Sequence, residues 1–104
     1  MKRETCKPAG LLQPMPIPDK PWSTVSMDFI SGLPMSQRLD TIMVVVDMLT
    51  KYVHFIGLSH PYSAAKVAAL FAQNVMKLHG MPTSIVLDKD PVFTAKFWAE
   101  LFKL

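Results

Sequence analysis

The sequence has little of the residue types that several common sites require. Cys6 is the only cysteine among 104 residues, so an internal disulfide and a cysteine-based zinc site are excluded within this chain. Only four glycines are present and none are clustered, which excludes a glycine-rich phosphate loop. Because Cys6 stands in a proline-rich stretch, we do not expect it to form a catalytic pair with a histidine.

Long hydrophobic runs are also missing. The longest, within residues 41–49, is far too short to cross a bilayer. Met1 is followed by Lys2 and Arg3 and not by the apolar stretch of a secretory signal. We therefore expect no membrane partner and an intracellular location, nuclear or cytoplasmic. The net charge of +3 is compatible with nucleic-acid binding, but the basic residues are scattered and fit many other proteins.

Half of the residues are hydrophobic, which is enough for one modest core in a chain of this length. Residues 1–22 contain five of the nine prolines and predict an extended lead-in. Residues 23–104 carry alternating strand-like and helix-like patterns and predict a single α/β unit.

The first part of this unit predicts three strands, over residues 24–31, 41–47 and 52–58. The connections between them are short, which favours an antiparallel meander. The second of these runs is almost entirely apolar and β-branched, as in a central strand.

The second part predicts a helix, a strand and a second helix. Ser63 can cap the first helix, and Gly80 can end it. Its expected apolar face consists of Val67, Leu70, Phe71, Val75 and Leu78. Residues 84–87 form a short strand that the crossover allows to lie parallel to an earlier one, and Thr94 can cap the last helix. The predicted order is β-β-β-α-β-α.

Two aspartates stand where strands carry few of them. Asp28 lies in the middle of the first strand, and Asp88 directly follows the fourth. If those strands are neighbours, the carboxylates converge and repel each other unless a hard cation such as Mg²⁺ binds between them. Alternatively, Asp28 caps a bulge and Asp88 begins a turn. The pattern alone leaves both interpretations open.

The other polar candidates are predicted to have structural roles. Asp47 is expected to cap the turn after the second strand, and Asp90 to belong to a turn before Pro91. Glu100 is expected on a solvated helix face. The three histidines are not spaced as a metal pair on one element. Of the aromatic side chains, Tyr62 is expected to be the most exposed.

Several longer runs resemble a known family. They are "KPAGLLQPMPIPDKPWSTVSMDFISGLP", "IMVVVDMLTKYVHFI", "LHGMPTSIVLDKDPVF" and "FWAELFKL". Together they are similar to the integrase region of Ty3/gypsy-type LTR retrotransposon polyproteins, over essentially the whole chain from Lys7 onward. The resemblance implies an incomplete ribonuclease H-like core of the retroviral integrase type, with residues 23–104 as the N-terminal part of the catalytic domain.

The resemblance also implies a function. The family joins element DNA ends to target DNA through Mg²⁺-dependent (or Mn²⁺-dependent) attack on phosphodiester bonds, at a metal site of two Asp and one Glu. "SMDFI" implies that Asp28 is the first of these ligands, and "IVLDKD" implies that Asp88 is the second. The implied partners are DNA, as element ends and target, and other integrase chains.

The sequence departs from the family pattern in a few places. The family usually has Ser or Thr where this sequence has Leu87, and a basic residue where it has Met48. The catalytic Glu of the family falls beyond Leu104, and Glu100 stands only twelve positions after Asp88. The zinc-binding region that precedes the family core and the basic region that follows it are also missing from this sequence. We therefore expect little or no catalysis by this chain alone, and leave open whether it is an enzyme.

Three other interpretations are weighed against this one. A non-catalytic module derived from an integrase would bind nucleic acid or protein through the same fold. A fragment without a stable fold would show no cooperative unfolding. A ribonuclease H fits less well, because the proline-rich lead-in and the "HGMP" segment match the integrase pattern.

Overall fold

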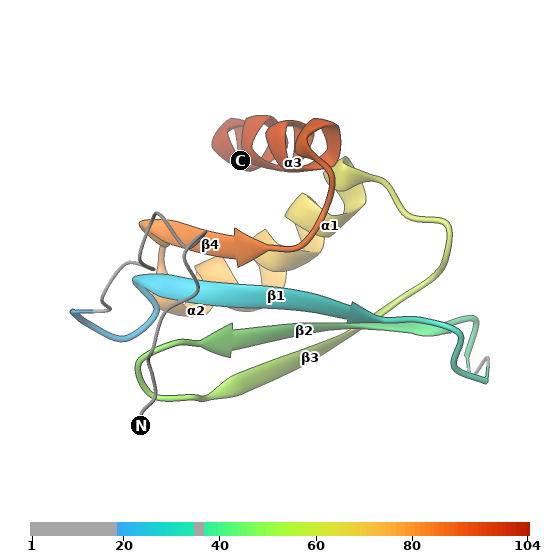
Figure 1. Cartoon of the computed structure of the whole chain (residues 1–104), viewed down its shortest axis with the longest axis horizontal. Helices are drawn as coiled ribbons and strands as arrows, with labels where there is room; N and C mark the ends of the chain where they lie inside the picture. Colours follow the sequence, from blue (N-terminus) through green and yellow to red (C-terminus); the bar gives the residue numbers. More distant parts are fainter. Residues whose placement is uncertain (1–18, 35–36) are drawn as a thin grey trace, which may run out of the picture.

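The structure is a computed structural model that describes residues 19–34 and 37–104. Most of the predicted lead-in lies outside the described residues. The strands are β1 (Thr24–Ile30), β2 (Thr41–Asp47), β3 (Val53–Leu58) and β4 (Ser84–Leu87). The helical segments are α1 (Ala64–Phe71), the π-helical turn η1 (Ala72–Met76), α2 (Lys77–His79) and α3 (Pro91–Lys103) (Figure 1). The predicted order of strands and helices is confirmed.

The four strands form one sheet in the order β3-β2-β1-β4. β1, β2 and β3 are antiparallel neighbours, as the short connections predicted. β4 lies parallel to β1, so the predicted crossover is also confirmed. In the β1–β4 pairing, Thr24 lies beside Ser84 and Met27 beside Leu87. This mixed α/β architecture is compatible with a ribonuclease H-like fold.

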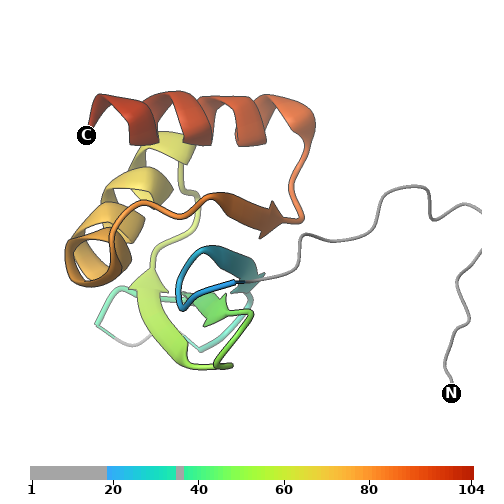
Figure 2. The ribbon, with the colours of Figure 1, turned by 90° about the vertical axis from the view of Figure 1, so that its left-hand side faces the viewer.

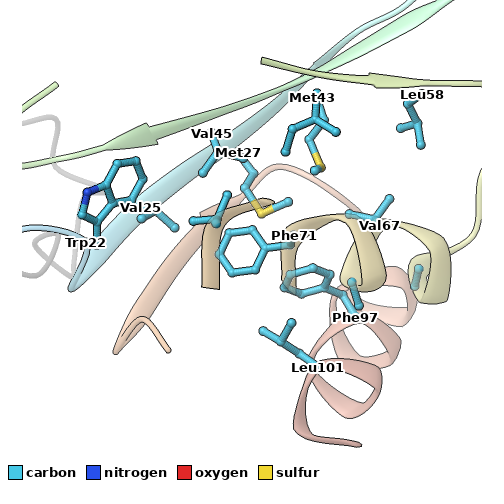
Figure 3. Close-up of a cluster of buried hydrophobic side chains, with 14 residues drawn as sticks. Trp22, Val25, Met27, Met43, Val45, Leu58, Val67, Phe71, Phe97 and Leu101 are labelled. Atoms are coloured by element: carbon cyan, nitrogen blue, oxygen red, sulfur yellow. The ribbon is translucent and has the colours of Figure 1, made fainter. Parts of the chain in front are cut away.

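The helices cover one face of the sheet (Figures 1 and 2). Strand side chains alternate between the two faces, and every second residue of β2 is buried. Side chains from the covered face meet those of α1, η1 and α3 in one hydrophobic cluster (Figure 3). Its largest fully buried members are Phe71, Phe97, Met27, Met43, Leu58 and Leu101. The opposite face of β1 and β2 is called the open face below.

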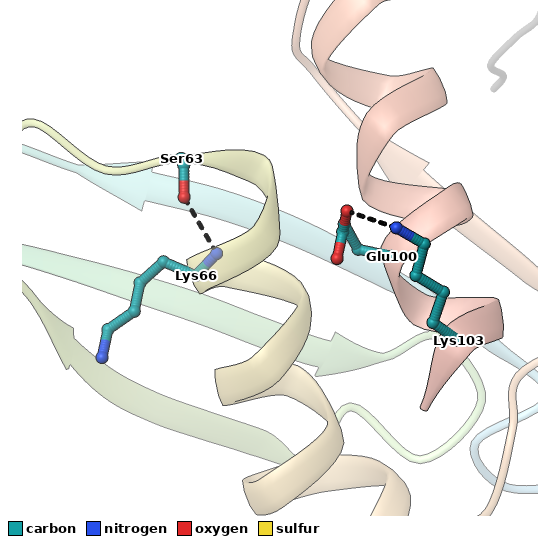
Figure 4. Close-up of polar contacts among 4 residues, drawn as sticks. All are labelled: Ser63, Lys66, Glu100 and Lys103. Atoms are coloured by element: carbon teal, nitrogen blue, oxygen red, sulfur yellow. Dashed lines mark hydrogen bonds and ion pairs between the residues drawn. The ribbon is translucent and has the colours of Figure 1, made fainter.

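The helix ends follow local hydrogen bonding. Ser63 Oγ accepts from the backbone N–H of Lys66 at 3.1 Å and so caps α1, as predicted (Figure 4). α3 begins earlier than expected, because Asp90, and not Thr94, is its cap. Asp90 Oδ1 accepts from the N–H of Phe93 at 2.9 Å, and Pro91 fills a first-turn position that needs no donor.

The long first helix contains a π-helical turn, η1, that the sequence pattern did not predict. Asn74 Nδ2 donates to the Leu70 carbonyl at 2.9 Å, across the start of this turn. The wider turn takes up one more residue than an α-helical turn and rotates the residues that follow. The prediction that Leu78 belongs to the apolar face is therefore wrong, and this side chain is 67% exposed.

No helix within the described ranges is long and apolar enough to cross a membrane.

Candidate metal site on the open face

Asp28 and Asp88 occupy neighbouring positions on two parallel strands. The last pair of the β1–β4 ladder is Met27 with Leu87, and the two aspartates are the residues that follow this pair, Asp28 within β1 and Asp88 directly after the end of β4. Side chains at matching positions of paired strands lie on the same face of a sheet. The structure thus brings together the two residues that the sequence predicted as metal ligands.

The two carboxylates lie on the open face. Met27 is buried in the core with only 1% exposure, so its successor Asp28 lies on the other side of β1. Asp28 and Asp88 are both exposed to solvent. Within residues 19–34 and 37–104, neither side chain takes part in a hydrogen bond or an ion pair. No protein group of these two ranges therefore occupies their oxygens.

The donor set fits a hard divalent cation. Mg²⁺ prefers carboxylate oxygens and is commonly held by one or two of them together with water and substrate phosphate oxygens. No cluster of three or more His, Cys, Asp or Glu side chains that could hold a metal occurs among the described residues. The candidate site in this part of the chain therefore consists of two carboxylates.

The surroundings of the carboxylates are open. Two surface hollows, of about 340 Å³ and 450 Å³, lie around Leu39 and Gly57. Neither hollow is lined by Asp28 or Asp88. The carboxylates thus stand outside both hollows, on an exposed part of the sheet.

Comparison with known proteins points to mobile elements. No protein-family model matches the chain. The Transposon Tf2-3 and Tf2-4 polyproteins of Schizosaccharomyces pombe are each 36% identical to it over 99 residues. These matches cover 95% of this chain and 7% of each polyprotein. The chain is thus similar to a segment of these Ty3/gypsy-type transposon polyproteins and spans 7% of their length.

A third aspartate of this polyprotein segment, Asp47, is a structural residue. Its carboxylate is fully buried and accepts four hydrogen bonds, from the N–H groups of Trp22, Leu49 and Thr50 and from the Thr50 hydroxyl at 2.6 Å. Burial by itself would raise the pKa of Asp47, but the hydrogen bonds together lower it. The predicted role as a turn cap is confirmed, and the contact with Trp22 adds to it.

A pair of histidines in the polyprotein segment was not foreseen. His54 Nε2 and His79 Nε2 lie 3.1 Å apart, and the ring of Trp22 stacks on that of His79 at a centroid distance of 4.0 Å. Burial lowers the pKa of His54, and the nearby His79 lowers it further. The two histidines are 25 residues apart, so no spacing rule could have indicated their contact.

The last acidic candidate of the polyprotein segment is Glu100 on α3. It forms a surface ion pair with Lys103 at 3.2 Å (Figure 4). The expectation that it lies on a solvated face agrees with the exposed Lys103 partner.

Proposed function

We propose that this polyprotein segment is part of an integrase catalytic core, in which Asp28 and Asp88 are two of the acidic metal ligands. The observation that carries the proposal is that both exposed aspartates directly follow the last β1–β4 pair, Asp28 within β1 and Asp88 just after β4. The match to transposon polyproteins supports the assignment, since such elements must insert their DNA.

The chemistry follows from the two carboxylates. Asp28 lies within β1 and pairs with Val44 of β2, one residue past the last pair between β1 and β4, so its backbone position is fixed by the sheet. Asp88 extends from the end of β4, and its oxygens complete a pair of hard donors for Mg²⁺ or Mn²⁺. When bound, such a cation activates a 3′-hydroxyl or water and stabilises the leaving oxygen of a phosphodiester.

The open face suits a large substrate. Two exposed carboxylates that lie outside the surface hollows leave room for a polynucleotide backbone, so DNA, as element ends and target, is the proposed partner. Asp28 and Asp88 are two of the three acidic ligands that the resemblance implies. We therefore expect cation binding, but little or no DNA cleavage, from this chain alone.

The test is a titration of the whole chain with Mn²⁺, followed by paramagnetic broadening of backbone amide signals in NMR spectra. The amides near Asp28 and Asp88 should broaden first. Asp28→Asn should weaken binding at least about tenfold, because even the loss of an outer partner of a metal ligand costs that much. Asp19→Asn, at another exposed aspartate, is the matched control and should leave binding unchanged.

Two results would contradict the proposal. Broadening centred elsewhere, or an Asp28→Asn variant that binds Mn²⁺ as the wild type does, would remove the metal site. DNA affinity without Asp28-dependent cation binding would favour the alternative, a non-catalytic nucleic-acid-binding module. Cation-dependent cutting of element-end DNA that Asp28→Asn abolishes would instead show that this chain is active alone.

A further inference from the structure

Lys89, the residue directly after Asp88, is enclosed by aromatic rings. Its Nζ donates a hydrogen bond to Tyr62 Oη at 2.7 Å. The same atom lies 4.6 Å from the ring centroid of Phe29, 5.0 Å from that of Tyr62 and 5.5 Å from that of Phe93. These four residues are called the lysine clamp below. Tyr62, expected to be exposed, is half-buried in it.

The clamp joins the two strands behind the carboxylates. Phe29 directly follows Asp28, and Lys89 directly follows Asp88. Both pairs of residues come immediately after the last β1–β4 pair, Met27 with Leu87. Alternation places Phe29 on the covered face, where it packs against the core and stacks with Tyr62 at 5.1 Å. The clamp is therefore on the opposite side of the sheet from Asp28 and Asp88.

The ladder between β1 and β4 cannot by itself fix Asp88. The last matched pair is Met27 with Leu87, and Asp88 lies just outside β4. Beyond that point, Lys89 connects the chain to β1 through Phe29, to the segment before α1 through Tyr62, and to α3 through Phe93. Cation–π contacts strengthen when the ammonium is partly withdrawn from water, so three rings around one Nζ restrict the loop residue that carries it.

The clamp also keeps the charge of Lys89 away from the carboxylates. No acidic side chain of the described residues lies within ion-pair distance of Nζ. The three rings and the Tyr62 hydroxyl thus contact the ammonium in place of a carboxylate.

We propose that Lys89 is a positioning residue: the lysine clamp fixes Asp88 beside Asp28 and thereby sets the cation affinity of the pair. The inference rests on the proposed function, because it assigns a device that serves the same two carboxylates.

When Lys89 is replaced by an uncharged residue, the proposal and simple electrostatics predict opposite changes in cation affinity. Removal of a positive charge near two carboxylates would strengthen cation binding if charge alone mattered. Loss of the clamp would weaken it, because Asp88 would no longer be held in place. The sign of the change therefore separates a positioning role from a general charge effect.

The experiment compares Mn²⁺ dissociation constants of the whole chain and four variants, together with the NMR backbone order parameter of Asp88 without metal. Lys89→Met should bind about tenfold more weakly. Lys89→Arg, which keeps a cation over the rings, should restore most of the affinity. Tyr62→Phe keeps the ring but removes the acceptor and should cause a loss of about threefold. Lys96→Met, at an exposed lysine of α3, is the control for charge and should bind at least as tightly as the wild type.

The outcomes are distinguishable. Unchanged or tighter Mn²⁺ binding by Lys89→Met overturns the positioning role, even if Asp28→Asn has confirmed the metal site. If the wild type binds no cation at Asp28 and Asp88, the proposed function fails. In that case the order parameter of Asp88 tests whether the lysine clamp positions this residue. It must fall in Lys89→Met and Tyr62→Phe but not in Lys96→Met. An unchanged order parameter overturns the clamp as well.

Discussion

Aspartates lie near both ends of β1, but their surroundings differ: one is buried and hydrogen-bonded, and the other two are exposed. At its start, Asp47 of the neighbouring strand is fully buried beside Trp22 and accepts four hydrogen bonds. Towards its other end, Asp28 and Asp88 are exposed and make no such bonds within the described residues. An aspartate whose oxygens accept hydrogen bonds from the chain thus stabilises the fold, whereas an exposed aspartate without such bonds is available to ligands.

The largest effect should come from Trp22 at the buried end. Trp22→Ala removes a core side chain and its stacking on His79, and should lower the free energy of unfolding by about 4 kcal/mol. Phe55→Ala, on β3, is the matched control, because this aromatic side chain is 70% exposed and its loss should cost less than about 0.5 kcal/mol. Urea unfolding followed by circular dichroism measures both. Equal decreases in the free energy of unfolding would contradict the difference in burial between Trp22 and Phe55.

A smaller effect is expected from the aspartates themselves. Asp47→Ala leaves buried donors without an acceptor and should lower the free energy of unfolding by about 3 kcal/mol. Asp28→Ala should change it by less than about 0.5 kcal/mol, since an exposed aspartate is disfavoured in a strand. The two variants can be compared by the same urea titration. A strongly destabilised Asp28→Ala would assign that residue a structural role.

The smallest effect should be a pH dependence at the buried end. Because the pKa of His54 is lowered in the folded chain, the unfolded chain binds a proton more readily. The stability that neutral His54 provides is complete above its ordinary pKa of 6.5 and declines as the pH falls below that value toward the lowered pKa of the folded chain. Thermal unfolding across this range should show the decline in the wild type and in His60→Gln, but not in His54→Phe. A wild-type stability that stays constant below pH 6.5 would refute this role of His54.

Much of the fold follows from local patterns in the sequence. The apolar and β-branched residues of the run 41–47 predicted β2 with its observed bounds. Ser63 and Gly80 marked the ends of the first helical region, and Gly80 has the positive φ of 88° that favours glycine. The length of the crossover allowed the parallel placement of β4, from which the neighbouring positions of Asp28 and Asp88 follow.

Features that depend on distant contacts were not predictable in this way. The lysine clamp takes its four residues from β1, the segment before α1, the end of β4 and α3. Only the folded chain shows that Tyr62 faces Lys89. The sequence does not identify Asp90 as the cap of α3, because a turn before Pro91 and a helix that starts there have the same sequence pattern. The metal ligands themselves were assigned by resemblance, and the geometry is compatible with that assignment.

The π-helical turn η1 has a consequence for how this segment tolerates insertions and deletions. Its additional residue determines which side chains of α2 face the sheet, so His79 lies against Trp22 and Leu78 faces solvent. Deletion of one residue between Ala72 and Met76 would give a regular α-helix and would still rotate His79 away from its partners. The packing of His79 against Trp22 and His54 is therefore expected to depend on the exact number of residues in this helix, whereas the exposed side chains of its outer face impose no such requirement.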